Sequence, residues 1–311
     1  MELFFAITEL VLPVLVMILI GVFCRVKNLF GEEVLDGIKK LITNFLLPAV
    51  IFGALARMEF SGTVLILAAL CLVMDVLALG VGFLTKPLLK EYGTYHPFLM
   101  AGYEVGLLGF ALFPLLVGAE NIGFLASLDA GGCIFFFCIY LPILQRENGV
   151  SESAKETIKN IFTAPSLIAC IIGLLCSATG LGNMLFTSAV GPTIDATLSL
   201  VTSPTTALIL VIVGYNLKLQ KDILLPVLKT SLLRLVTMAG ICVLAILFLQ
   251  LIGITDALVI YSLIFMSALS APYIVSVYAK GEKQISYIST QVSLYSIVIF
   301  IVFVVMRVVL V

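Results

Sequence analysis

The chain has 311 residues, of which 62% are hydrophobic and only 11% carry a charge, and its formal net charge is −1. A soluble domain of this length needs a much larger polar fraction to cover its surface, so a polytopic membrane protein is predicted instead. The near-zero net charge gives no sign of a nucleic-acid partner. All seven cysteines lie in apolar runs without metal-ligand spacing, so we expect no disulfide, no metal site and no cofactor.

Ten apolar segments are long enough to cross a membrane, since a spanning helix needs about twenty mostly apolar residues. They are 6–25, 37–57, 62–84, 95–117, 121–144, 161–179, 191–217, 223–251, 255–279 and 285–309. The first segment follows Glu2 instead of a basic stretch and has no small-residue cleavage site, so we expect it to remain as a membrane helix. The predicted fold class is therefore all-α, with ten transmembrane helices surrounded by membrane lipid.

Basic residues alternate between the connecting loops. The loops after the odd-numbered segments hold Arg25, Lys27, Lys39, Lys40, Lys86, Lys90, Arg146, Lys155, Lys159, Lys218, Lys221, Lys280 and Lys283. The other loops and both termini hold only Arg57 and Arg307. Because cytoplasmic loops are enriched in positive charge, this pattern predicts a multi-pass protein of the cytoplasmic membrane with both termini outside.

A polar linker at 146–160 divides the chain near its midpoint into a first half, 1–145, and a second half, 161–311. Each half has five predicted helices, and because five is odd, two similar halves would be inserted in opposite orientations. Pro13 is followed by a glycine eight residues later, and Pro165 repeats this spacing at the corresponding place of the second half. Inverted repeats are typical of transporters that bind substrate near the membrane midplane, where broken helices meet.

Helix breaks are predicted at corresponding places in the two halves. In the fourth segment, the stretch 102–114 is rich in glycine, ends in proline and contains the acidic Glu104. In the ninth segment, Pro272 frees a carbonyl group one turn earlier, and Ser270 and Ser276 can bond the exposed groups. Unwound backbone is tolerated in a membrane only where it is buried in protein or lines a cavity. The paired breaks therefore predict a substrate site.

Three acidic residues lie at least two turns inside their predicted helices: Asp75, Glu104 and Asp129. Ionisable groups are costly in lipid, so each suggests proton or cation handling, because a carboxyl group at low dielectric can load and release a proton. The alternative is structural, with a protonated or hydrogen-bonded carboxyl group that only holds helices together. Glu104 is the strongest candidate because it adjoins the first break.

Five further ionisable residues are expected to be structural: Asp195, Asp256 and Glu120 at outer helix ends, and Lys229 and Arg234 on the cytoplasmic side. Arg234 is thus predicted to extend its charged end to the interface. The single histidine, His96, is near a helix start and is predicted to be an interfacial side chain. Asn44 lies one turn before a proline and fits either a substrate site or helix packing. Tyr273 and Gln291 are weaker site candidates.

At these positions the chain resembles the auxin efflux carrier family, which contains bacterial relatives of the plant PIN-formed auxin carriers. Residues 20–25 and 45–52 look like the opening of that family. Residues 104–111, Glu-Val-Gly-Leu-Leu-Gly-Phe-Ala, are similar to its Asn-x-Gly-Phe-Leu-Gly-x-Pro pattern, and Pro272 falls at its second broken helix. The similarity covers essentially the whole chain.

This resemblance implies a sodium/proton-antiporter-like fold in which broken helices 4 and 9 cross. It implies a mobile transport domain of helices 3–5 and 8–10, a dimerising scaffold of helices 1, 2, 6 and 7, and elevator motion between them. It also implies carboxylate substrates, such as auxin in plants and malate or malonate in bacteria. Gly106, Gly109 and Pro272 match residues of the family motif. Glu104 and Ala111 depart from it, since the family has a neutral amide and a proline there.

The main hypothesis is a secondary active transporter of a small organic acid that works by alternating access with proton or sodium coupling. The amide groups at Gly106, Leu107 and Gly109 would bind the carboxylate, together with residues near the breaks: Asn44, Ser270, Pro272, Tyr273 and Ser276. Glu104, with Asp75 or Asp129, would take the coupling ion.

A fixed carboxylate at Glu104 would repel an anion, so either it is protonated when the anion binds or the substrate is not an anion. The alternatives are a carrier of a neutral or cationic substrate, an uncoupled facilitator or channel, and a ligand sensor with a transporter fold. An enzyme is not expected, because the chain has no HExxH motif and its single histidine stands alone.

Overall fold

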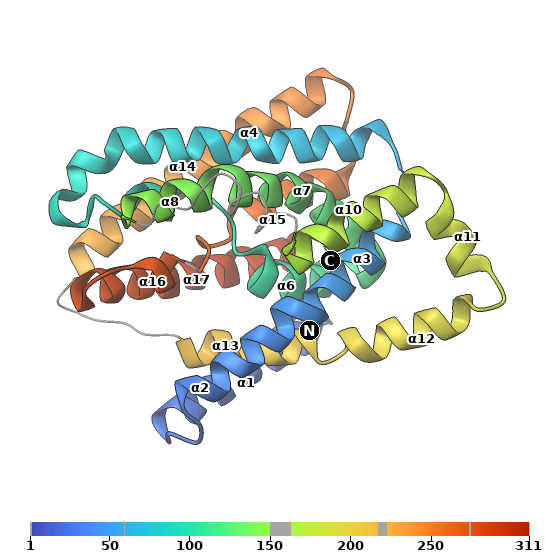
Figure 1. Ribbon diagram of the computed structural model, residues 1–311, viewed down its shortest axis with the longest axis horizontal. Coiled ribbons are helices and arrows are strands. Elements are labelled where there is room, and N and C mark those ends of the chain that lie inside the picture. The colour runs from blue at the N-terminus through green and yellow to red at the C-terminus, as the bar shows by residue number, and fades with distance from the viewer. Residues whose placement is uncertain (1, 59, 150–162, 217–222, 274, 311) are drawn as a thin grey trace.

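The computed structural model describes residues 2–58, 60–149, 163–216, 223–273 and 275–310, and the regular elements in these ranges are all helical (Figure 1). The first part of the chain forms α1 (Glu2–Val26), α2 (Glu32–Leu41), the π-helix η1 (Ile42–Leu46), α3 (Leu47–Ala56), α4 (Gly62–Thr85), the 3-10 helix η2 (Lys86–Tyr92), α5 (His96–Met100), the π-helix η3 (Val105–Gly109), α6 (Phe110–Val117), the 3-10 helix η4 (Ala119–Asn121), α7 (Ile122–Phe135), the π-helix η5 (Phe136–Tyr140) and α8 (Leu141–Glu147). The second part forms α10 (Pro165–Ala178), α11 (Leu181–Thr187), α12 (Gly191–Thr202), α13 (Thr205–Asn216), α14 (Leu224–Leu251), α15 (Ala257–Ser267), α16 (Val275–Tyr278) and α17 (Glu282–Leu310).

Six helical stretches in the described residues are long and apolar enough to cross a membrane, or seven if α10 and α11, which meet at 86°, form one span. The predicted all-helical, polytopic character is therefore confirmed. The segments predicted at 95–117 and 255–279 are each broken into shorter helices, so neither contains one helix of spanning length. The ten-helix inverted repeat stays a prediction, and residues 150–160 of the predicted linker lie outside the described residues.

The helices pack in two groups (Figure 1). In one group α1 lies along α13, and α3 packs against α10 and α12; in the other, α4 packs against α5, α7 and α14, and α14 packs against α15 and α17. The close approach of α1 to α13 requires small residues, because a Cβ atom at Gly21 would collide with the Val211 carbonyl, and one at Gly214 with the Ile18 carbonyl. The assignment of these groups as scaffold and transport domain stays a prediction.

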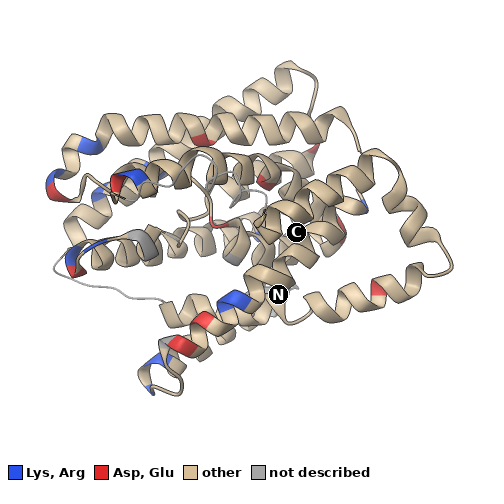
Figure 2. Ribbon diagram, viewed as in Figure 1, with Lys and Arg blue, Asp and Glu red and all other residues tan. Residues whose placement is uncertain are grey.

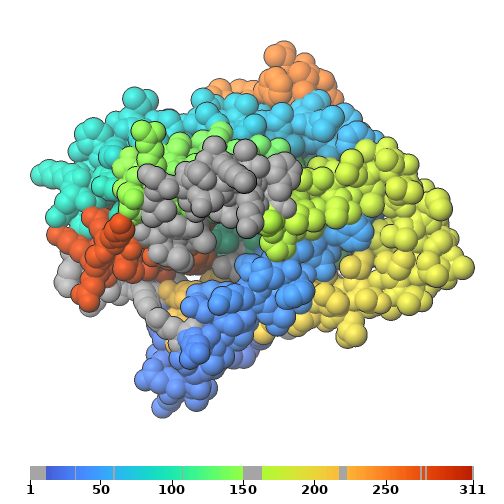
Figure 3. Space-filling view, in the orientation of Figure 1, coloured from blue at the N-terminus to red at the C-terminus, as the bar shows by residue number. Residues whose placement is uncertain are grey.

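The outer surface of the protein is strongly apolar. Large side chains such as Leu84, Leu200 and Leu251 are 81%, 77% and 84% exposed, which suits contact with lipid tails. In the space-filling view, α11 and α12 form one edge of the molecule (Figure 3).

Charged residues gather at helix ends, and few lie in the middle of the long helices (Figure 2). Two acids that we expected to be structural have structural partners. Asp195 pairs with Arg57, and Asp256 caps α15 by accepting the amide hydrogen of Leu258 at 2.7 Å. The few acids left inside the helix bundle therefore need a different explanation.

Candidate functional site

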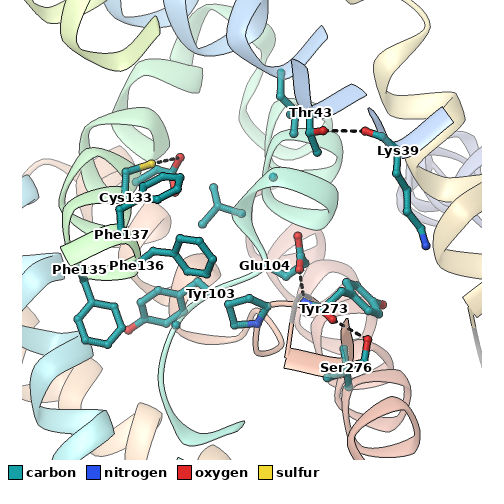
Figure 4. Close-up of a pocket in the computed structure, with 18 of the residues that line it drawn as sticks. Lys39, Thr43, Tyr103, Glu104, Cys133, Phe135, Phe136, Phe137, Tyr273 and Ser276 are labelled. Atoms are coloured by element: carbon teal, nitrogen blue, oxygen red, sulfur yellow. Dashed lines mark hydrogen bonds between the residues drawn. The ribbon is translucent and has the colours of Figure 1, made fainter. Parts of the chain in front are cut away.

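The two helix breaks lie against each other. The first separates α5 from η3, and the second separates α15 from α16. Across them, the Glu104 amide donates to the Ser270 carbonyl at 2.8 Å, and the Tyr273 amide donates to Glu104 Oε2 at 2.7 Å (Figure 4). Gly102 has a φ of +73°, and a Cβ atom there would lie 2.9 Å from Pro272 Cγ. Glu104 thus binds the second break with both its backbone and its side chain.

Asp75 and Arg234 bind opposite sides of the backbone at Gly102. Asp75 Oδ1 accepts the Gly102 amide hydrogen at 2.9 Å, whereas Arg234 Nη2 donates to the Gly102 carbonyl at 2.7 Å. The same guanidinium donates to the carbonyls of Leu99 and Leu269, both at 2.9 Å. Arg234 therefore donates hydrogen bonds to carbonyl groups at the ends of both broken helices. Neither helix can satisfy these carbonyl groups with its own amide groups, because the last carbonyl groups of a helix have no partner within it.

The prediction that Arg234 reaches the interface is wrong, because its side chain is 0% exposed. Arg234 lies ten residues into α14, or about 15 Å along the helix axis, which is close to half the hydrocarbon thickness. At that depth the carbonyls freed by the breaks are better partners for five N–H groups than distant water is. This depth, together with the predicted breaks, is the sequence signal that could have identified Arg234.

The prediction of an interfacial His96 is also wrong. Its ring is 0% exposed, and its two nitrogen atoms lie 2.8 Å from Thr85 Oγ1 and 3.0 Å from Thr230 Oγ1. His96 is therefore a bonded interior residue that joins α4, α5 and α14.

A cavity of about 600 Å³ extends from the breaks to the surface beside α2. Its mouth is lined by Asp36, Lys39 and Lys40, and Lys39 is paired with Asp36 at 3.2 Å. Among the described lining residues, Lys39 and Lys40 are the basic ones. The cavity is thus positively charged at the mouth and acidic farther in, where its lining includes Asp75, Glu104 and Asp129.

Aromatic side chains form part of the cavity wall. Tyr103 and the run Phe135–Phe137 lie on one side, and Lys39 lies on the other, with Glu104 and Tyr273 between them (Figure 4). The site can therefore hold a molecule with both an apolar part and a polar group. The described residues contain no group of three or more His, Cys, Asp or Glu side chains that could hold a metal ion.

A family model described as Membrane transport protein matches residues 6–306. The chain belongs to this family of membrane transport proteins. The match confirms the resemblance to the auxin efflux carrier family. A relative named "Uncharacterized transporter", from Methanothermobacter thermautotrophicus, is 25% identical over 179 residues, which cover 56% of this chain and 58% of the relative. The aligned part thus spans less than two thirds of that relative.

Most of the predicted site residues of this transport protein line the cavity: Asp75, Glu104, Gly106, Asp129, Pro272, Tyr273 and Ser276. Ser270 is buried beside the cavity, where its carbonyl binds Glu104, and Gly109 is buried against Leu269. Asn44 is exposed and does not line the cavity. The side chain of Leu107 lies outside the described part. The roles of these residues in substrate and ion binding stay predictions.

Sequence reasoning missed the aromatic wall and the two lysines at the mouth. Phe136 and Phe137 come from η5, a π-helix that follows α7, so their position could not be read from an ordinary helical period. Phe135 ends α7, and Tyr103 lies in the first break. Lys39 and Lys40 were counted only as loop charges, because nothing in the sequence showed that α2 ends at the cavity.

Proposed function

We propose that the protein is a secondary active transporter of a small organic acid in the cytoplasmic membrane, driven by a proton or sodium gradient. The observation that carries the proposal is a single cavity that reaches from exposed lysines to both helix breaks. Its volume of about 600 Å³ lies within the usual range of small-molecule sites. Membership in a family of membrane transport proteins supports the same activity.

The charge distribution suggests how substrate and ion movements are coupled. Lys39 and Lys40 attract a carboxylate to the mouth, whereas Asp75, Glu104 and Asp129 repel it farther in. An organic anion therefore moves to the breaks only when a proton or a sodium ion neutralises an acid there. The aromatic wall contacts the apolar part of the substrate, and the amide groups at the start of η3 bind its carboxylate.

Alternating access in this proposal is an elevator motion. The bodies that move are the group around α4, α7, α14 and α17, with the group around α1, α3, α10 and α13 as a fixed scaffold through which two copies pair. Both termini lie outside, since the basic loop residues gather on the cytoplasmic side. The cavity then opens toward the cytoplasm, because Lys39 and Lys40 line its mouth.

A second candidate is a carrier of a cationic amine, which the acidic deep end of the cavity favours. Transport assays in proteoliposomes that hold the purified protein distinguish the two candidates. Under an inward proton or sodium gradient, we expect the gradient to increase the uptake of radiolabelled malate or malonate. Uptake of a labelled alkylamine, with none of the two carboxylates, would support the second candidate. Uptake of neither class under any gradient would contradict transport of these substrates.

Glu104→Gln tests the coupling. We expect gradient-driven uptake to fall by about 10-fold or more, because an amide cannot take up a proton. Exchange of labelled for unlabelled substrate without a gradient should persist, because the amide oxygen can still accept the Tyr273 amide hydrogen. The matched control is Glu120→Gln, which changes an exposed acid outside the cavity. Unchanged gradient-driven uptake in Glu104→Gln would rule out the coupling role.

A further inference from the structure

Gln291 presents an unexplained polar group inside the helix bundle. Its side chain is 0% exposed, and neither Nε2 nor Oε1 has a hydrogen-bond partner among the described residues. It is not part of the cavity, which α17 lines with Ile288, Ser289 and Val292. A buried amide without partners is strongly unfavourable, so a native structure retains one only where something satisfies it.

Gln291 lies in the seam between α14 and α17. Thr230 Oγ1 and the Tyr287 hydroxyl are 2.6 Å apart, and the Arg234 guanidinium lies 5.2 Å from the ring centre of Tyr295. The second contact lies farther along both helices than the first, so α14 and α17 run parallel. Gln291 is one turn beyond Tyr287, as Arg234 is one turn beyond Thr230, which brings Gln291 level with Arg234.

A chain of polar side chains leads to this position. Thr85, His96, Thr230 and Tyr287 are joined by contacts of 2.8, 3.0 and 2.6 Å, and they come from four different helices. The chain stops at Tyr287, one helical turn before Gln291. The guanidinium that bonds the carbonyls of both breaks lies against Tyr295, one helical turn beyond Gln291. Gln291 thus sits in the gap between a hydrogen-bonded chain and the residue that holds the two breaks.

We propose that Gln291 binds water in the seam between α14 and α17, and that this water continues the His96 chain to Arg234. Water fits the chemistry because the amide offers both N–H donors and a carbonyl acceptor, and water can accept from the first and donate to the second. A bare anion would satisfy only Nε2. A bare cation would satisfy only Oε1 and would be repelled by the Arg234 charge. The site is separate from the substrate cavity.

The stability of Gln291→Met tests the proposal, because methionine has a similar shape but no amide. If water bridges the amide, the variant loses satisfied hydrogen bonds, and the Tm of the purified protein in detergent falls by roughly 3 °C. If the amide is dry, its removal relieves an unpaired polar group, and the Tm rises. Thr230→Val gives the reference loss, since it removes a hydroxyl that is bonded within the protein. A Tm for Gln291→Met at or above that of the wild type would overturn the proposal.

A second measurement needs no variant. Short X-ray exposure produces hydroxyl radicals from water, including water bound inside a protein, and these oxidise the nearest side chains. We expect oxidation of Tyr287 and Tyr295, which are both 0% exposed and lie one turn on either side of Gln291. Phe303, on the same helix and 1% exposed, is the internal control and should remain unmodified. Equal protection of the tyrosines and Phe303 would overturn the proposal.

Discussion

Arg234 shows how one side chain can make two helix breaks compatible with a membrane interior. A break leaves carbonyl groups that the helix itself does not satisfy, and each costs several kcal/mol in an apolar medium. The Arg234 guanidinium donates to carbonyls of both breaks, on Leu99, Gly102 and Leu269. It is a fixed, fully buried charge, and Asp75 lies on the other side of the same Gly102 backbone. The two breaks therefore depend on one residue of a third helix.

Arg234→Leu is expected to lower the free energy of unfolding by about 3 kcal/mol or more, because it leaves several buried carbonyls without donors. Arg234→Lys should lose less, since an ammonium group keeps the charge but cannot bond carbonyls on two helices in the same forked geometry. Denaturant unfolding in mixed micelles measures both. Lys229→Met is the control on the same helix, at an exposed position. A loss for Arg234→Leu no larger than that of this control would contradict the role assigned to the guanidinium.

The two broken elements were predictable because glycine and proline report on backbone geometry directly. The sequence located both breaks and the acid beside the first one. It could not show that the Glu104 side chain binds the Tyr273 amide, because that contact depends on how the two elements meet. Asn44 shows the opposite case, in which a residue predicted for the site does not line the cavity. It lies in η1, a π-helix whose altered period leaves Asn44 exposed while Thr43 and Leu47 line the cavity.

Gly102→Ala tests the contact between the breaks, and Gly180→Ala is its matched control. Gly102 and Gly180 have nearly equal φ values, +73° and +74°, so alanine costs about 1 to 2 kcal/mol of backbone strain at either position. Only at Gly102 would the new Cβ atom meet another side chain, Pro272, at 2.9 Å; nothing lies within 4 Å of it at Gly180. We therefore expect a larger stability loss for Gly102→Ala.

Adding Pro272→Ala to the Gly102→Ala variant should recover part of the extra loss, because it removes the ring atoms that the new Cβ atom would meet. Thermal unfolding of the two single variants and the double variant gives the coupling directly. Equal losses for Gly102→Ala and Gly180→Ala would mean that the breaks do not touch at this point.

The cavity connects the breaks with one face of the protein. Exposed residues of α2 form its mouth, and the carboxyl groups beside the breaks form its inner end. The sequence predicted which face is cytoplasmic from the alternation of loop charges. It could not predict on which face the cavity opens, because in the proposed alternating access the site would open on each face in turn. The orientation of the cavity therefore needs a direct measurement.

Cys133 can report this orientation, because it is partly exposed and lines the cavity. In a variant that keeps Cys133 and lacks the other six cysteines, we expect a membrane-impermeant thiol reagent to label inside-out vesicles and not right-side-out vesicles. A bound substrate should slow the labelling by occupying the same space.

The variant that keeps only Cys138 is the control. This exposed residue lies five positions farther along the chain but does not line the cavity, so substrate should not change its labelling rate. Labelling of Cys133 only from the outer face would show either that the termini lie on the cytoplasmic side or that the cavity opens outward in the membrane. A second reagent directed at a cysteine introduced at Lys283, in a predicted cytoplasmic loop, separates these two outcomes because its labelling depends on topology alone.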